Sequence, residues 1–332
     1  MDAFAPENCH ERLLASAPRR LQFDPKNDFK QWRRELDAKL RELIGSLPGR
    51  SPLNLRVVSE TKHERRFVFS AEPGADVPCH LLLPETGAAP FPVVICLQGH
   101  TTGMHISLGR AKHWKDRGAL RGDRDFARQA VRQGCAALAI EQRCFGERKD
   151  RRQNRELKSD CQHATMTALL LGRTMIGERV CDLSRAIDVL AKFPEIDTRK
   201  IGCVGQSAGG TVAYYGACLD ERITITMPSC VVCTYEDSLA RIDHCADNYL
   251  PRALEFFEMA DLAGLIAPRP LAVVSGRQDR IFPMHGVEKA FARIQEIYTA
   301  AGVTDRCKLI VGEGGHRFYA NLAWPVFRSL WK

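Results

Sequence analysis

Beyond Pro92 the chain alternates between short, continuous apolar runs and longer stretches with helical periodicity. The apolar runs are residues 93–97, 136–140, 201–204, 223–227, 271–274 and 309–311. The helical stretches are residues 125–133, 166–191, 209–219, 286–300 and 318–330. Strands without polar alternation are buried on both faces, and repeated strand–helix units form parallel sheets covered by helices. The pattern predicts an α/β fold, a mostly parallel twisted sheet of about eight strands with helices on both faces.

The residues before Pro92 follow two other patterns. Asp28 precedes an apolar stripe of helical period that runs from Phe29 to Ile44 and ends at Gly45, which predicts a capped helix. Residues 55–83 alternate between polar and apolar side chains in three short segments, which predicts antiparallel strands joined by tight turns. We therefore expect a helical N-terminal extension over residues 1–51 and one catalytic α/β domain over residues 52–332.

Composition excludes several classes of protein. Of the 332 residues, 45% are hydrophobic and 27% are charged, which is typical of a globular chain and excludes disordered and collagen-like classes. The chain has no run of about 18 apolar residues, the length needed to span a bilayer, so we expect no membrane association. Residues 1–20 lack the apolar core of a signal peptide, and the sequence therefore predicts a cytoplasmic protein.

The cysteine content and the net charge have ordinary interpretations. The thirteen cysteines are odd in number and lie mostly within apolar runs, as expected for reduced, buried thiols. The net charge of +8 arises from 48 basic and 40 acidic residues that are interspersed along the chain, so we expect no nucleic-acid binding. A homo-oligomer is compatible with the sequence, which does not determine the oligomeric state.

The sharpest local signal is the sequence Gly205-Gln206-Ser207-Ala208-Gly209, between a predicted strand and a predicted helix. A G-x-S-x-G motif in this context is typical of a nucleophile elbow, a tight turn that exposes the serine hydroxyl. Its small residues allow the neighbouring backbone to come close. The alternative is a glycine-rich turn that only packs. We predict that Ser207 is a catalytic nucleophile.

A serine nucleophile needs a histidine base and a carboxylate that orients it, and in this type of sheet the chain order is serine, acid, histidine. Asp279 follows the predicted strand 271–274, and His316 follows the last predicted strand in a glycine-rich turn. We therefore predict the triad Ser207, Asp279 and His316. The alternatives for the acid are Asp243, Asp247, Asp261 and Glu313, and nine other histidines compete with His316.

The oxyanion of the reaction needs two hydrogen-bond donors. We predict that one is the backbone N–H of Ala208, the residue after the nucleophile. The other is the backbone N–H of His100, in the loop after strand 93–97, where Gly99 allows a close approach to the elbow. We assign no role to the imidazole of His100.

These segments together resemble the α/β-hydrolase superfamily. The resemblance rests on the sequences of residues 96–100, 141–147, 205–210, 276–279 and 315–316, and it is closest to the acetyl xylan esterase-like and dienelactone hydrolase-like branch. It implies serine esterase chemistry with Ser207, Asp279 and His316 as the triad. Many relatives carry His-Gly where this chain has Gln98-Gly99.

Three other signals are weaker. Cys230 and Cys233, with His244 and Cys245 nearby, could suggest zinc, but residues three apart on a strand point to opposite faces, so we expect no metal. No dinucleotide-binding or Walker-type loop is present, so we expect no cofactor. The basic stretch 149–158 is typical of a solvated loop, with a preference for anionic substrates as the alternative.

The sequence therefore predicts a serine hydrolase that cleaves a small carboxylic ester, with a short acyl group such as acetyl on a sugar or small alcohol. The irregular stretches 145–164 and 233–262 are expected to roof the pocket. Two alternatives remain open: a serine peptidase or amidase on the same fold, and a non-catalytic binding protein.

Overall fold

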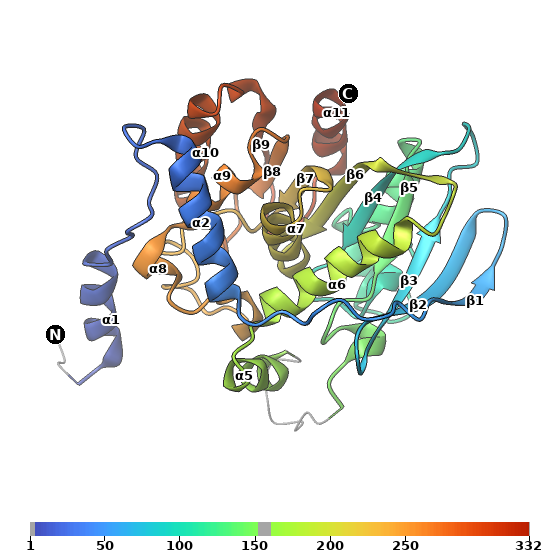
Figure 1. The fold of residues 1–332 in the computed structure, drawn as a ribbon, viewed down its shortest axis with the longest axis horizontal. Helices are drawn as coiled ribbons and strands as arrows, with labels where there is room; N and C mark the ends of the chain where they lie inside the picture. The colour runs from blue at the N-terminus through green and yellow to red at the C-terminus, as the bar shows by residue number, and fades with distance from the viewer. Residues whose placement is uncertain (1–3, 152–160, 332) are drawn as a thin grey trace.

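The structure is a computed structural model that describes residues 4–151 and 161–331. Within these ranges one sheet has the strand order β1-β2-β3-β5-β4-β6-β7-β8-β9 (Figure 1). Neighbours from β5 through β9 in this order run parallel, whereas β1, β2, β3 and β5 pair antiparallel. The strands are β1 (Arg56–Glu60), β2 (Glu64–Glu72), β3 (Ala75–Leu82), β4 (Phe91–Leu97), β5 (Ala136–Ile140), β6 (Ile196–Gln206), β7 (Ile223–Ser229), β8 (Leu271–Gly276) and β9 (Cys307–Gly312).

Helices cover both faces of this sheet. The α-helices are α1 (Pro6–Ala15), α2 (Phe29–Ile44), α3 (Asp116–Arg121), α4 (Phe126–Arg132), α5 (Gln162–Leu170), α6 (Met175–Leu190), α7 (Ala208–Leu219), α8 (Ala253–Phe256), α9 (Ala263–Ile266), α10 (Met284–Ala300) and α11 (Ala320–Leu330). Short 3₁₀ helices are η1 (Met104–Ile106), η2 (Gly146–Arg148), η3 (Ala246–Asn248), η4 (Met259–Leu262) and η5 (Thr304–Arg306).

The core has one part on each face of the sheet, because successive strand residues point in opposite directions. In β4, Val93, Ile95 and Leu97 pack with residues of α2, α6, α7, α9 and α10. Val94 and Cys96, which alternate with them, pack with residues of α4 and α11. All five side chains are buried. The predicted parallel sheet between two helical layers is therefore confirmed.

The N-terminal segment docks on the larger body through α2. The side chain of Asp28 accepts a hydrogen bond from the backbone N–H of Gln31 (2.8 Å), which confirms the predicted cap. Trp32 is buried against α9, where a β-carbon on Gly264 would lie 2.4 Å from the indole ring. Helix α1, at the left edge of Figure 1, lies within the expected helical extension, for which the sequence specified only the helix from Phe29 to Ile44.

Two sequence predictions about local structure were wrong. The single helix expected over residues 166–191 is two helices, α5 and α6, because the chain turns at Gly172 (φ +71°) and Thr174 caps α6 by accepting from Gly177 N–H. The stretch 233–262, expected to be a polar loop, contains η3, α8 and η4 and contributes buried residues such as Phe257 to the core. Most of the basic stretch 149–158 lies outside the described residues.

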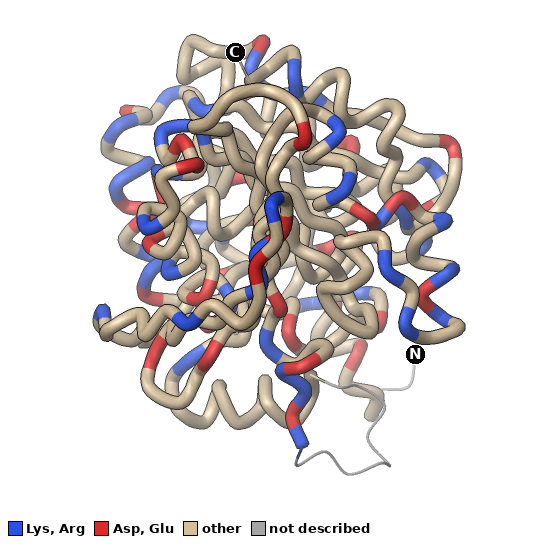
Figure 2. The backbone as a smooth tube through the Cα atoms, turned by 90° about the vertical axis from the view of Figure 1, so that its right-hand side faces the viewer, with Lys and Arg blue, Asp and Glu red and all other residues tan. Residues whose placement is uncertain are grey.

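Charged side chains are spread along the backbone. Basic and acidic positions are interspersed over the part of the chain visible in Figure 2. Among the described residues, no helix combines the length and the apolar character needed to cross a bilayer.

Candidate active site

Ser207 occupies a sharp turn between β6 and α7. Its backbone has a positive φ (φ 57°, ψ −128°), a conformation that is strained for a serine. A β-carbon on Gly205 would lie 2.2 Å from the carbonyl oxygen of Gly209, and one on Gly209 would lie 2.1 Å from that of Leu97. Only glycine fits at both positions, so the local sequence is the one that this turn requires.

Asp279 and His316 form a hydrogen-bonded pair at the ends of β8 and β9. The Nδ1 of His316 lies 2.8 Å from Oδ2 of Asp279. The other carboxylate oxygen of Asp279 accepts hydrogen bonds from the backbone N–H groups of Ile281 (2.9 Å) and Phe282 (3.2 Å). The carboxylate is therefore fixed on both sides and holds the imidazole with its Nε2 available for another partner.

The serine turn is connected to this pair through the end of β7. The backbone N–H of Ser207 donates to the carbonyl of Ser229 (2.9 Å). The thiol of Cys230, the next residue, lies within 4.8 Å of ligand atoms of Asp279 and His316. Within residues 4–151 and 161–331, the structure contains no hydrogen bond between Ser207 Oγ and His316. The three predicted residues thus lie at one edge of the sheet, without a hydrogen bond between Ser207 and His316. Such a bond between nucleophile and base often forms only with substrate bound.

The ring of His316 is further held by its neighbours. Phe282 stacks on the imidazole, with the ring centroids 5.9 Å apart and an interplanar angle of 18°. The guanidinium of Arg124 donates to the backbone carbonyl of His316 (3.0 Å). These contacts restrict the histidine to one orientation relative to Asp279.

The pKa of Asp279 follows from the same contacts. Burial raises the pKa of this carboxyl group. The hydrogen bond and charge of His316, together with the two backbone donors, lower it by more, so the net pKa lies below its usual value. Asp279 is therefore charged at neutral pH. Burial raises the pKa of the neighbouring Cys230 thiol to about 12, which keeps that sulfur protonated.

The two residues predicted to supply oxyanion donors lie next to the elbow. Ala208 is the first residue of α7, where backbone N–H groups have no partner within the helix. Gly99 packs directly on the turn, since a β-carbon there would lie 2.6 Å from Gln206 O and 2.9 Å from Ser207 Cβ. This close approach places the backbone of His100 beside Ser207.

The imidazole of His100, to which the sequence assigned no role, forms a second histidine–aspartate pair. Its Nε2 lies 3.1 Å from Oδ2 of Asp247, which also forms an ion pair with Nη1 of Arg179 (2.6 Å). Burial lowers the pKa of His100, but hydrogen bonds to Asp247 and Cys245 raise it to about 9. No spacing motif indicates this cluster, because its members are far apart in the sequence.

The other candidate acids have different partners. Asp261 is buried and accepts a hydrogen bond from the backbone N–H of Phe23 (2.9 Å), whereas Glu313 is exposed and pairs with Arg277 (3.0 Å). Of the five candidate acids, Asp279 is the one that pairs with His316 among the ion pairs of the described residues.

Cys230 and Cys233 follow β7 and do not lie within it, so the strand geometry invoked against zinc does not apply. The Cys230 thiol contacts the Arg317 carbonyl (3.2 Å) and the Cys233 thiol contacts that of Pro283 (3.8 Å). The two sulfurs therefore have separate surroundings. No disulfide bond joins any two cysteines in the described part of the chain.

The side chain of Gln98 contacts Glu141. Its amide donates to the Glu141 carboxylate (3.0 Å), and the backbone N–H of Met104 donates to the same oxygen (2.9 Å). Burial raises the pKa of Glu141 to about 7. The side chain of Gln98 therefore supports the loop that carries His100.

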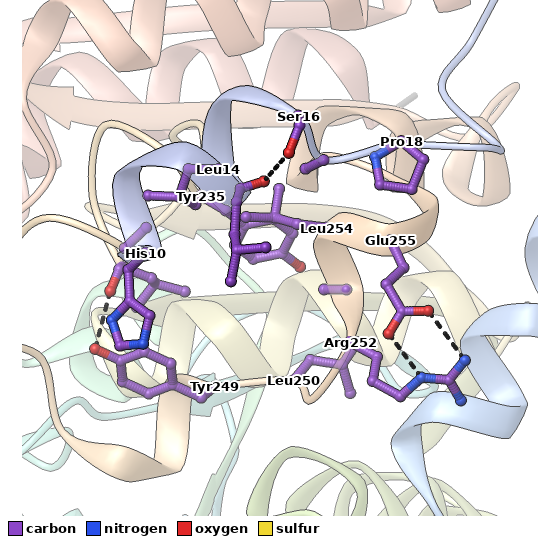
Figure 3. A pocket seen from close by; sticks show the side chains of 15 residues that line it. His10, Leu14, Ser16, Pro18, Tyr235, Tyr249, Leu250, Arg252, Leu254 and Glu255 are labelled. Carbon is purple, nitrogen blue, oxygen red and sulfur yellow. Dashed lines mark hydrogen bonds and ion pairs between the residues drawn. The ribbon is translucent and has the colours of Figure 1, made fainter. Parts of the chain in front are cut away.

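Two cavities lie near these loops. One of about 690 Å³ separates α1 from the 235–255 segment and is lined by Leu14, Tyr235 and Tyr249, whose hydroxyl donates to the backbone (Figure 3). The other, of about 700 Å³, lies beside the loop after β4 and is lined by residues including Thr102 and Trp114. The second cavity adjoins the loop of His100.

The fold and the site have the features of the α/β-hydrolase class. These are a parallel sheet between helical layers, a serine on a strained strand-to-helix turn, and an Asp–His pair at the ends of the last strands. The family model described as the Abhydrolase family matches residues 13–301, so the chain belongs to that family and is a hydrolase. The resemblance inferred from the sequence is confirmed.

Individual relatives agree with this assignment. "Putative hydrolase YtaP" of Bacillus subtilis (strain 168) is 26% identical over 309 residues, which cover 90% of this chain and 99% of the relative. A Bacteroides fragilis structure titled as a "putative acetyl xylan esterase" has a TM-score of 0.77 at 17% identity and covers 97% of this chain and 84% of its own. The glucuronoyl esterase from Solibacter usitatus has a TM-score of 0.71 at 17% identity, covering 94% of this chain and 96% of its own. At these identities the two structures show the fold alone.

Proposed function

We propose that this protein is a serine esterase that cleaves carboxylic esters through an acyl-enzyme, with Ser207 as nucleophile. The observation that carries the proposal is the Asp279–His316 pair, with its 2.8 Å hydrogen bond, at the same sheet edge as the strained turn of Ser207. A serine hydroxyl needs such a base at neutral pH.

In the proposed mechanism His316 Nε2 accepts the proton of the Ser207 hydroxyl as its oxygen attacks the ester carbonyl. Asp279 holds the imidazole through Nδ1 and stabilises its charged form. The backbone N–H groups of Ala208 and His100 stabilise the oxyanion. His316 then protonates the leaving alcohol, and water repeats these steps on the acyl-enzyme to release the acid.

The proposed substrate is an ester of a short acyl group, such as acetyl, on a sugar or small alcohol. An alkoxide leaves more readily than an amide nitrogen, which favours esters over peptides. The structural neighbours titled as carbohydrate esterases support the same choice.

The test is a rate series of p-nitrophenyl esters of increasing acyl length, beside acetylated sugars and a matched anilide. We expect hydrolysis of the short esters, slower hydrolysis of the anilide, and loss of about 10⁴-fold or more of kcat in Ser207→Ala. Ser184→Ala is the matched control. The Ser184 hydroxyl donates to Asp220, which follows the C-terminal end of α7, whereas Ser207 precedes its N-terminal end.

Labelling with a fluorophosphonate separates esterase from binding protein. We expect the probe to label Ser207 in the folded wild type and to leave Ser207→Ala unlabelled. Equal hydrolysis by wild type and Ser207→Ala, or no labelling of folded protein, would overturn the proposal.

A further inference from the structure

A second cluster of polar side chains lies beside the elbow, and the proposed mechanism uses none of these side chains. It consists of His100, Cys161, Cys245 and Asp247, whose ligand atoms all lie within 4.8 Å of one another. These residues come from the loop after β4, the N-terminal end of α5, and the turn into η3. Three segments distant in sequence thus bring two sulfurs, one nitrogen and one carboxylate together.

The carboxylate of this cluster is buried, and only one of its two oxygens has a hydrogen-bond partner among the described residues. Asp247 is fully buried, and its Oδ2 accepts from His100 and Arg179. Within the described residues its other oxygen, Oδ1, has no hydrogen-bond partner. A buried oxygen without a partner is costly, and a bound ion is one of its ordinary explanations.

The donor types suit a thiophilic divalent cation. Zinc takes four ligands in tetrahedral geometry from thiolates, imidazole and carboxylate. Edges of such a tetrahedron are roughly 3–4 Å long, and the observed His100 Nε2 to Asp247 Oδ2 distance is 3.1 Å. All four ligand atoms lie within 4.8 Å of one another, so their spacing is close to that of a tetrahedral ligand set.

Charge balance supports the same conclusion. Two thiolates and the Asp247 carboxylate carry three negative charges, and a divalent cation with the guanidinium of Arg179 carries three positive charges. Arg179 is already in place, because its Nη1 bonds Asp247 (2.6 Å) and its Nη2 lies 3.7 Å from the Cys161 sulfur. The buried cluster is neutral once the cation binds and the protons of both thiols and of His100 Nε2 leave to solvent, so that the imidazole ligates in its neutral form.

The cluster is accessible from outside. Cys161 is buried, but Cys245 is partly exposed and the side chain of His100 is 35% exposed. A hydrated ion can therefore reach the ligands without opening the core.

We propose that His100, Cys161, Cys245 and Asp247 form a binding site for Zn²⁺ or a similar thiophilic divalent cation, with Arg179 as the charge-balancing neighbour. The site joins the loop after β4, α5 and η3 next to the elbow. It departs from the sequence prediction of no metal, and it does not depend on the proposed esterase activity.

The second group of potential ligands, Cys230, Asp279 and His316, does not support a metal site. Both oxygens of Asp279 are used, by His316 and by two backbone N–H groups. Of these two groups of potential ligands, only the Asp247 group has a buried carboxylate oxygen without a hydrogen-bond partner.

The experiment uses the full chain, purified under reducing conditions and stripped with a chelator. Zn²⁺ is titrated against a chromogenic competitor, and Co²⁺ is added as a spectroscopic probe of thiolate ligation. We expect one equivalent to bind, with thiolate-to-Co²⁺ absorption. Cys161→Ser, Cys245→Ser and His100→Ala should each weaken Zn²⁺ binding roughly 100-fold or more.

Two cysteine variants serve as controls. Cys144 is buried and its thiol hydrogen-bonds that of Cys161, so Cys144→Ser tests whether a neighbouring thiol suffices. Cys9 is exposed on α1, and Cys9→Ser tests non-specific binding. Both should retain the wild-type affinity, and circular dichroism checks that every variant folds.

Three results would overturn the proposal. The first is no Zn²⁺ binding by the reduced wild type above that of a denatured control. The second is unchanged affinity in both Cys245→Ser and the surface variant His100→Ala. The third is equal loss of binding in Cys144→Ser and Cys245→Ser, which would mean that the donor set is wrong.

Discussion

Two histidine–aspartate pairs flank the elbow, and they differ in what surrounds the carboxylate. In the His316–Asp279 pair the carboxylate is fixed by two backbone N–H groups, and the imidazole is held through Nδ1. In the His100–Asp247 pair the carboxylate is fixed by the guanidinium of Arg179, and the imidazole is held through Nε2.

This difference separates two kinds of chemistry that use the same residue types. Backbone donors carry no net charge, so Asp279 remains the counter-charge of His316 and stabilises its protonated form. The Nε2 of His100 is occupied by Asp247, whereas His316 is held through Nδ1 and keeps its Nε2 available as a base. Two nearby cysteines, Cys161 and Cys245, instead give the second pair the character of a ligand set.

The largest difference is expected when each imidazole is removed. His316→Ala should lower kcat for a short p-nitrophenyl ester by about 10⁴-fold or more, because no base remains for Ser207. His100→Ala should lower it less than about tenfold, because the backbone N–H that faces the oxyanion stays in place. Equal losses in the two variants, measured with enzyme of verified fold, would contradict the assignment of the base.

The carboxylates should differ in which property they control. Asp279→Asn should lower kcat by about 10⁴-fold through loss of imidazole orientation, while its remaining oxygen still accepts from the backbone. Asp247→Asn should lower stability by about 3 kcal/mol, because it leaves the charge of buried Arg179 without compensation. Urea denaturation beside ester kinetics measures both, and the reverse pattern would refute the comparison.

The smallest expected effect is the pH dependence of stability. Burial raises the pKa of Asp247, but the charge of Arg179 and the His100 hydrogen bond bring it well below the unfolded value of 3.8. Its stabilising contribution is therefore complete above pH 3.8 and is lost as the pH falls further. The stability difference between wild type and Asp247→Asn should stay constant from about pH 7 to about pH 5 and should shrink as the pH falls below 3.8.

The alkaline limb of the same profile involves His100. Its pKa of about 9 lies above the unfolded value of 6.5, so its contribution is complete below pH 6.5 and is lost as the pH rises through about 9. In His100→Ala this alkaline loss should be absent. A wild-type profile that is flat on both limbs in chelator-treated protein would show that the pair is not coupled to folding.

The fold was predictable because its signals are local and repeated. Each buried strand is a short apolar run, and the turn around Ser207 needs glycines that stand within two residues of it. Asp279 and His316 were found for the same reason, since each follows a strand directly. Their roles in catalysis remain predictions, which the proposed kinetics would test.

The second cluster was not predictable, because it depends on the packing of segments without a spacing motif. Cys161 lies just before α5, Arg179 lies on α6, and Cys245 and Asp247 lie in a stretch that the sequence suggested to be a polar loop. The error over 233–262 has the same origin: short helices such as α8 have too few residues to show a periodicity. Only tertiary structure brings these residues together.

The docking of Trp32 against Gly264 has a consequence for synthesis of the chain. The apolar stripe of α2 leaves the ribosome about 230 residues before α9, which at roughly 5–20 residues per second corresponds to a delay on the order of 10–50 s. During that time Trp32, Leu36 and Leu40, all buried in the finished protein, lack the part of their packing that α9 provides. The nascent chain therefore completes the packing of the apolar stripe of α2 only after its last third has begun to be made.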